Sequence, residues 1–136
     1  MSSKLHQFIL VLLVRKAMEK GYFPIAYHGK EKLFPGVKFK IPPTIRRHKP
    51  DLVAIDLVNR RICIADAKTD SDLTSERTKE QIMDFSNLKP TKPWSSECII
   101  GVPKRSEQKF VKLLKKWGLS RKNNLSYIFV PEELSD

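Results

Sequence analysis

Two runs of strand-forming residues with almost nothing between them most strongly constrain how this chain can fold. Residues 51–58 and 61–68 are rich in Val, Ile, Leu and Ala, and only Asn59 and Arg60 separate them. Such a short connection is typical of two antiparallel strands joined as a hairpin, because parallel strands need a crossover of a dozen residues or more. The sequence therefore predicts a β-hairpin in the middle of the chain.

The hairpin brings three charged residues together. With a tight turn at residues 59–60, Asp51 lies opposite Lys68 and Val53 lies opposite Asp66. Because side chains alternate between the two faces of a sheet, these acids and the lysine share one face, which is otherwise apolar. We therefore expect Asp51, Asp66 and Lys68 to converge at the open end of the hairpin.

The elements around the hairpin follow from hydrophobic periodicity and turn residues. Helices are predicted over residues 4–20, 72–87 and 106–117, and further strands over 22–27, 98–102 and 125–130. The order is α-β-β-β-α-β-α-β, which predicts an α/β fold with a mixed central β-sheet flanked by helices. We expect a single domain over residues 1–136 with a basic loop at about 28–49, in which 37–41 forms an extended piece.

Composition narrows the class of protein. The chain has 136 residues, a length that suits one domain. The longest apolar run, Phe8 to Val14, is too short to span a membrane, and no small-residue cleavage site follows it. Cys63 and Cys98 lie inside predicted strands without the close spacing of a zinc knuckle. The sequence thus indicates a reduced, intracellular and cytoplasmic protein with no zinc site and no membrane contact.

The excess of basic residues points to a polyanionic partner. The formal charge is +11, and residues 28–49 hold seven Lys and Arg against the single acid Glu31. Nucleic acid is the commonest intracellular polyanion. We expect four of these basic residues to bind nucleic acid: Lys30, Arg46, Arg47 and Lys49. Residues 104–122 form a second basic stretch, and the sequence leaves open whether it contacts DNA or is a solvated surface.

The chemistry of the three converging groups favours a metal site. Two adjacent carboxylates repel each other unless a cation lies between them. Oxygen ligands with room for water describe a Mg²⁺ site, with Mn²⁺ as a substitute, formed by Asp51, Asp66 and the backbone carbonyl of Ala67. Such an ion polarises a phosphoryl oxygen, and Lys68 can position a water, so the chemistry indicated is phosphodiester hydrolysis. The alternative is that Asp51 begins a strand and Asp66 pairs with Lys68 on the surface.

The spacing of these residues resembles a known signature. Lys49-Pro50-Asp51, fourteen intervening residues and then Asp66-Ala67-Lys68 is similar to the motif of the PD-(D/E)XK nuclease superfamily, although many members have Glu where this chain has Asp66. The resemblance covers most of residues 5–130 and implies a restriction-endonuclease-like fold. It further implies a magnesium-dependent nuclease in which Asp51 and Asp66 bind the metal and Lys68 assists the attacking water.

Two more residues enter through the resemblance. Gln81 and Phe85, four apart on a predicted helix, resemble a QxxxY element in which the glutamine lies beside the active site; the alternative is a solvent-facing glutamine next to a core phenylalanine. Glu19 extends the inward stripe of the first helix, where many members carry a further metal ligand; the alternative is an exposed glutamate in the last turn. His28 and His48 are weaker candidates for a general base.

The leading expectation is a magnesium-dependent DNA endonuclease. A Holliday junction resolvase of the same superfamily remains open, and so do a nucleic-acid-binding module without catalysis and a subunit that binds another partner. The sequence does not separate DNA from RNA. Because one site cuts one strand per encounter, cleavage of both strands or of a junction would favour a homodimer.

Overall fold

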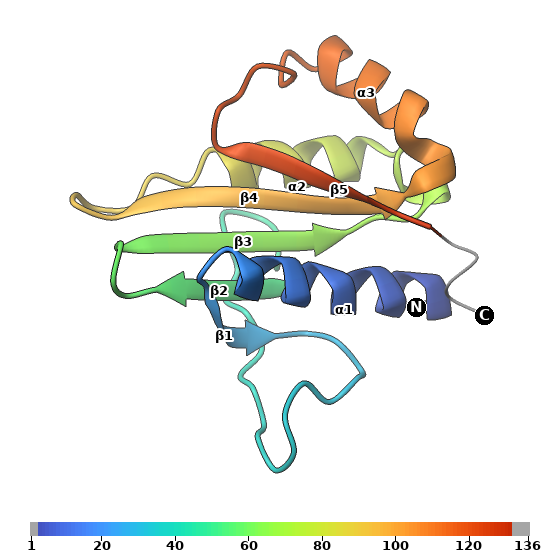
Figure 1. Cartoon of the computed structure of the whole chain (residues 1–136). Helices are drawn as coiled ribbons and strands as arrows, with labels where there is room; N and C mark the ends of the chain where they lie inside the picture. The colour runs from blue at the N-terminus through green and yellow to red at the C-terminus, as the bar shows by residue number, and fades with distance from the viewer. Residues whose placement is uncertain (1–2, 132–136) are drawn as a thin grey trace.

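The computed structural model of the protein describes residues 3–131, and its elements follow the predicted order (Figure 1). Short 3-10 turns at Asp70–Asp72 and Lys104–Ser106 precede the second and third helices. The helices and strands are α1 (Lys4–Glu19), β1 (Phe23–Tyr27), β2 (Leu52–Asp56), β3 (Arg61–Ala67), α2 (Glu76–Ser86), β4 (Ser95–Pro103), α3 (Glu107–Lys116) and β5 (Leu125–Val130). The α/β architecture with a mixed sheet is confirmed.

The five strands form one sheet in the order β1-β2-β3-β4-β5. The pairs β1–β2 and β2–β3 are antiparallel, whereas β3–β4 and β4–β5 are parallel. The carboxyl ends of β3, β4 and β5 therefore lie at the same edge of the sheet as the start of β2 (Figure 1). This edge is where ligands commonly bind in α/β sheets.

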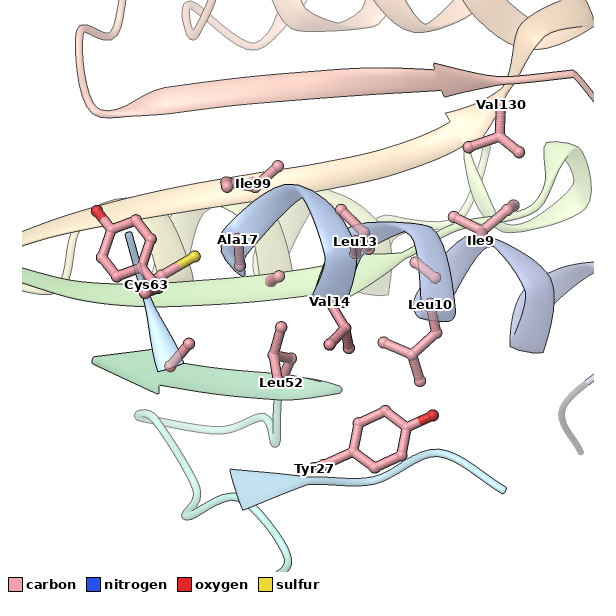
Figure 2. Close-up of a cluster of buried hydrophobic side chains, with 14 residues drawn as sticks. Ile9, Leu10, Leu13, Val14, Ala17, Tyr27, Leu52, Cys63, Ile99 and Val130 are labelled. Carbon is pink, nitrogen blue, oxygen red and sulfur yellow. The ribbon is translucent and has the colours of Figure 1, made fainter. Parts of the chain in front are cut away.

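Helix α1 covers one face of the sheet. Its inward stripe of apolar side chains packs on β2, β3 and β4, as Figure 2 shows for Ile9, Leu13 and Ala17. A Cβ added at Gly101 of β4 would lie 2.6 Å from Ile9 Cγ2. Glycine at this position thus allows the helix to approach the sheet closely. The first turn of α1 lies at the sheet edge described above.

Helices α2 and α3 cover the other face (Figure 1). In α2 the predicted inward positions Thr78, Ile82 and Phe85 are buried, as are Phe110 and Leu114 in α3. Both helices pack against a second apolar cluster that includes strand residues of β3 and β4. The sheet is therefore the central layer between α1 and the α2–α3 pair.

The register of the β2–β3 hairpin differs from the prediction by two residues. Asp56, not Val58, faces Arg61, so the connection contains the four residues 57–60 and not a two-residue turn. The Asp56 carboxylate accepts hydrogen bonds from the backbone N–H and side-chain amide of Asn59, and Arg60 adopts φ 55°. These contacts end β2 early. An even shift leaves every side chain on its predicted face.

The β1–β2 connection, residues 28–51, is less regular than expected. The extended piece predicted at 37–41 contributes one isolated bridge, in which the Tyr27 N–H donates to the Lys40 carbonyl oxygen at 2.9 Å. A second bridge joins Ile45 to His48 across a turn in which Arg46 has φ 56°. Nowhere in residues 3–131 is there a helix long and apolar enough to cross a membrane.

Candidate functional site

Asp51 and Asp66 meet across the β2–β3 pair. Asp51 directly precedes β2, and Leu52 pairs with Ala65, so Asp51 faces Asp66 and not Lys68 as predicted. The Asp51 N–H donates to Asp66 Oδ1 at 3.0 Å, and the Ala67 N–H donates to Asp51 Oδ2 at 2.9 Å. Each carboxylate is thus held by the backbone of the neighbouring strand.

Lys68 completes the predicted cluster from the end of β3. Its Nζ lies 2.8 Å from Asp66 Oδ2 and also donates a hydrogen bond to Oε1 of Gln81, on helix α2. All three side chains are buried, with Asp66 only 3% exposed. The interpretation of Asp66 and Lys68 as a surface ion pair is therefore wrong. Gln81 lies beside the charged cluster, whereas Phe85 packs in the core.

His6 joins the cluster although the sequence analysis did not select it. Its Nε2 lies 3.3 Å from Asp51 Oδ2, and its buried Nδ1 has no hydrogen-bond partner among the described residues. The signal was available, because His6 precedes Ile9, Leu10 and Leu13 at spacings of three, four and seven. A polar residue at the end of an inward apolar stripe points toward the edge of the sheet.

The cluster perturbs the acidity of its members in opposite directions. Burial, followed by the charge of Asp51, raises the pKa of Asp66 to about 7. Burial also acts to raise the pKa of Asp51, but hydrogen bonds from His6 and from the Ala67 N–H outweigh it, and the net shift is downward. The hydrogen bond to Asp51 raises the pKa of His6. Asp51 is therefore the carboxylate that is more readily ionised.

A cavity of about 910 Å³ opens over these residues. Of the residues predicted to bind nucleic acid, Lys30, Arg47 and Lys49 line it, and so do Arg77 of α2 and His28. Arg46 does not line it; its side chain borders a separate hollow beside Asp84 and Leu88. The structure therefore brings basic side chains from the 28–49 loop and from α2 around the two carboxylates.

Two basic groups near the carboxylates already have acidic partners. Arg47 Nε and Nη2 donate to the two oxygens of Asp84 at 3.2 Å, and its Nη1 lies 3.4 Å from Glu80. These contacts fasten the loop to α2. His48 is buried beside Phe85 at 3.8 Å from Asp84 and does not line the cavity, so its geometry does not suit a general base there.

Glu19 lies far from the cluster, and its predicted role as a metal ligand is not compatible with this structure. It is exposed in the last turn of α1, thirteen residues beyond His6. At a rise of 1.5 Å per residue this is about 20 Å along the helix axis. The prediction that Glu19 extends the inward stripe is therefore wrong, and because the helix runs along the sheet its two ends also reach opposite edges.

Asp51 and Asp66 are the carboxylates in this cavity that could hold a metal ion together. Within residues 3–131 no group of three or more His, Cys, Asp or Glu side chains is placed to hold a metal. Mg²⁺ is commonly bound through one or two carboxylates, with water and substrate phosphate completing its shell. Asp51 and Asp66 meet that requirement, and Ala67 lines the same cavity.

Comparison with protein-family models, with curated proteins and with solved structures finds no match to this chain.

Proposed function

We propose that this protein is a magnesium-dependent DNA endonuclease with a restriction-endonuclease-like fold. The observation that carries the proposal is the meeting of Asp51, Asp66 and Lys68 in one cavity whose walls bear further basic side chains. Two carboxylates and a lysine suit metal-assisted phosphodiester hydrolysis, and the surrounding cations suit a phosphate backbone. The similarity of the Lys49-Pro50-Asp51 and Asp66-Ala67-Lys68 segments to the PD-(D/E)XK signature supports the same assignment.

Each residue has a distinct role in this proposal. Asp51 and Asp66, with the Ala67 carbonyl oxygen, would hold Mg²⁺ or Mn²⁺, which when bound supplies positive charge at the phosphoryl oxygen and lowers the pKa of a water. Lys68 would stabilise the negative charge that develops on the phosphate or orient the attacking water. Gln81 is a positioning residue, because its amide oxygen accepts a hydrogen bond from the Lys68 ammonium.

The proposal includes the setting of the reaction. A reducing, cytoplasmic compartment fits two cysteines that are both free thiols. The substrate is DNA in this proposal, with RNA as a comparison in the test. Cutting both strands of a duplex, or a junction, would need a homodimer, because each chain carries one cluster of Asp51, Asp66 and Lys68 within its described residues.

The first test is cleavage by the purified protein of a substrate panel: linear duplex, supercoiled plasmid, single strand, flap, four-way junction and RNA. Each substrate is incubated with Mg²⁺, Mn²⁺ or EDTA. We expect cutting with either metal and none with EDTA. Asp51→Asn, Asp66→Asn and Lys68→Ala should each reduce the rate at least about 100-fold, because each removes a group worth several kcal/mol to the transition state.

Asp70→Asn is the matched control. It makes the same chemical change four residues from Asp66, but Asp70 contacts Ser106 and Lys109 and does not line the cavity. Its activity should stay within about twofold of wild type, and circular dichroism should show all variants folded. Equal activity of wild type and the three site variants would reject the site. Binding without cutting under every condition would instead favour the non-catalytic module.

A further inference from the structure

A second hollow lies along α1, beside the stripe that packs on the sheet. It has a volume of about 670 Å³ and runs between the helix and residues 30–34 of the β1–β2 connection. We call it the α1 groove, and its apolar lining consists of Phe8, Val11, Val14, Met18, Leu33 and Phe34. From Lys4 to Met18 the groove follows the helix for about 21 Å at 1.5 Å per residue, which is long enough for several nucleotides.

Packing of the core accounts for only part of this apolar surface: Val14 is buried in the core and Phe8 and Leu33 pack partly against it, whereas Val11, Met18 and Phe34 lie outside the core clusters. The inward stripe of α1 buries Ile9, Leu10 and Leu13, whereas Phe8 and Val11 point to the groove and are only half-buried. A helix that needs one apolar face to cover a sheet usually carries polar residues on the other. Val11 and Met18, with the accessible part of Phe8, therefore give α1 an apolar surface outside its core-facing stripe.

The opposite wall presents an aromatic ring in a fixed position. Phe34 stacks on Phe23 with ring centroids 5.9 Å apart and planes 4° apart, and it lies 6.1 Å from the Phe39 ring. Phe8 faces the groove from the helix. Two aromatic side chains therefore line one apolar hollow from different elements.

The rim of the groove is strongly basic. Lys4 and Arg15 on the helix and Lys30 and Lys32 on the connection surround it, against the carboxylate of Glu31. An apolar floor with aromatic rings inside a basic rim is the arrangement that binds single-stranded nucleic acid, in which bases stack and the backbone follows the cations. Charge complementarity therefore favours a polyanion with apolar faces over a neutral ligand.

The groove adjoins the cavity that contains the carboxylates. Ser3, Gln7 and Lys30 line both hollows, and the Lys30 N–H donates to Gln7 Oε1 at 2.7 Å where they meet. His6, the neighbour of Gln7, contacts Asp51. A strand whose phosphate lies beside Asp51 and Asp66 can therefore continue into the groove.

We propose that the α1 groove binds unpaired bases of the nucleic-acid strand whose adjoining phosphate enters the cavity of Asp51 and Asp66. This inference deepens the proposed function and rests on it for the fate of the bound strand. In a duplex the base faces are stacked on one another and cannot reach an apolar floor. The substrate is therefore single-stranded, or carries an unpaired segment next to the phosphate that is cut.

Binding is measured apart from cleavage, in EDTA, by fluorescence anisotropy with a labelled 20-nucleotide single strand and the matched duplex. We expect the single strand to bind at least about fivefold more tightly than the duplex. Phe34→Leu, which keeps the apolar volume but removes the ring, should weaken single-strand binding about fivefold or more and change duplex binding less than twofold. Val58→Glu, on the exposed hairpin turn, is the control for added negative charge, and Val11→Glu in the groove should abolish the single-strand preference.

A second readout needs no variant. A single strand carrying 2-aminopurine should lose fluorescence on binding to the wild-type protein, because the base stacks on an aromatic ring. Equal affinity for both substrates, or an unchanged preference in folded Phe34→Leu and Val11→Glu, would overturn the inference. The inference would also be overturned if competing oligonucleotides displaced none of the bound strand and an acidic amphipathic peptide bound saturably. A single-strand preference in EDTA without cutting in Mg²⁺ would reject the proposed function and leave the groove assignment standing.

Discussion

At the scale of single residues, Gly29 shows how closely the cavity wall packs on the core. A Cβ at this position would lie 2.1 Å from Oη and 2.2 Å from Cζ of Tyr27, a buried side chain beneath the start of the basic loop. Glycine is required at residue 29 because a side chain has no space there, and not because of the backbone conformation. Any side chain at residue 29 must displace either the Tyr27 ring or the loop that carries His28 and Lys30 into the cavity.

We therefore expect Gly29→Ala to reduce the free energy of unfolding by about 1–3 kcal/mol, as overpacking of a well-packed site does. Tyr27→Phe should be nearly neutral, because the Tyr27 hydroxyl is buried without a hydrogen-bond partner in residues 3–131. Tyr27→Val should lower the cost of Gly29→Ala, since the ring that clashes is gone. Urea unfolding of Gly29→Ala, Tyr27→Val and the double variant measures the coupling between the two residues, and additive effects would contradict the contact.

The residues of the candidate site were predicted unevenly, for reasons that differ from residue to residue. Asp51, Asp66 and Lys68 converge as predicted because the observed register differs from the predicted one by two residues, an even shift that leaves each side chain on its predicted face. Gln81 was found through a resemblance, and its contact with Lys68 agrees with that placement. His6 was not predicted, although its spacing from Ile9, Leu10 and Leu13 places it on the inward face of α1 at the correct edge of the sheet.

At the scale of elements, the β2–β3 connection decides where the site is assembled. Propensity predicted both strands, but the turn depends on how one side chain bonds to its neighbours. Asp56 accepts from Asn59 and pairs with Arg61 Nη2 at 2.7 Å, and these contacts select a four-residue connection. A side-chain network of this kind is not visible in a pattern of apolar and polar residues, so the register of the hairpin could not be predicted from the sequence.

The network gives the turn a dependence on pH. The hydrogen bond from Asn59, followed by that from Arg61, lowers the pKa of Asp56 to about 2. Because the folded pKa lies below the unfolded value of about 4, the ionised carboxylate stabilises the fold above about pH 4, and this stabilisation is lost as the pH falls toward 2. We expect Asp56→Asn to be less stable than wild type at neutral pH.

The difference in stability between wild type and Asp56→Asn should shrink steadily between about pH 4 and pH 2.5, where the Asp56 carboxyl takes up a proton in the unfolded chain but stays largely ionised in the folded one. Urea midpoints measured by circular dichroism across this range test the expectation. Glu19→Gln, at an exposed residue of α1, controls for the loss of one negative charge. A difference that stays constant with pH would show that the Asp56 charge does not stabilise the turn.

At the scale of the whole molecule, many of the basic residues behind the formal charge of +11 lie in two regions that have different surroundings in the fold. In the first region, Lys30, Arg47 and Lys49 of the 28–49 loop and Arg77 of α2 lie around the buried carboxylates, and Lys30 and Lys32 line the α1 groove. In the second region, Lys112, Lys115 and Lys116 are exposed on α3, a helix that packs through Phe110 and Leu114 against the face of the sheet opposite α1. The sequence could not separate these roles, because charge runs look alike until the fold places them.

The salt dependence of nucleic-acid binding separates the two regions. Each phosphate neutralised on a single strand contributes about 0.7 to the slope of log affinity against log salt concentration. A variant that neutralises three side chains of the cavity should lower the slope for single-stranded DNA by about 2: Lys30→Gln, Lys49→Gln and Arg77→Gln. A matched variant on α3 makes the same change in net charge and should lower the slope by less than about 0.5: Lys112→Gln, Lys115→Gln and Lys116→Gln.

Both slopes come from anisotropy titrations in EDTA between about 50 and 300 mM salt, so metal-dependent cutting does not affect them. Because net charge falls by three in each variant, a general electrostatic attraction would reduce the two slopes equally. That result would contradict a path for the strand through the cavity, and a larger effect of the α3 variant would move the binding surface to that helix.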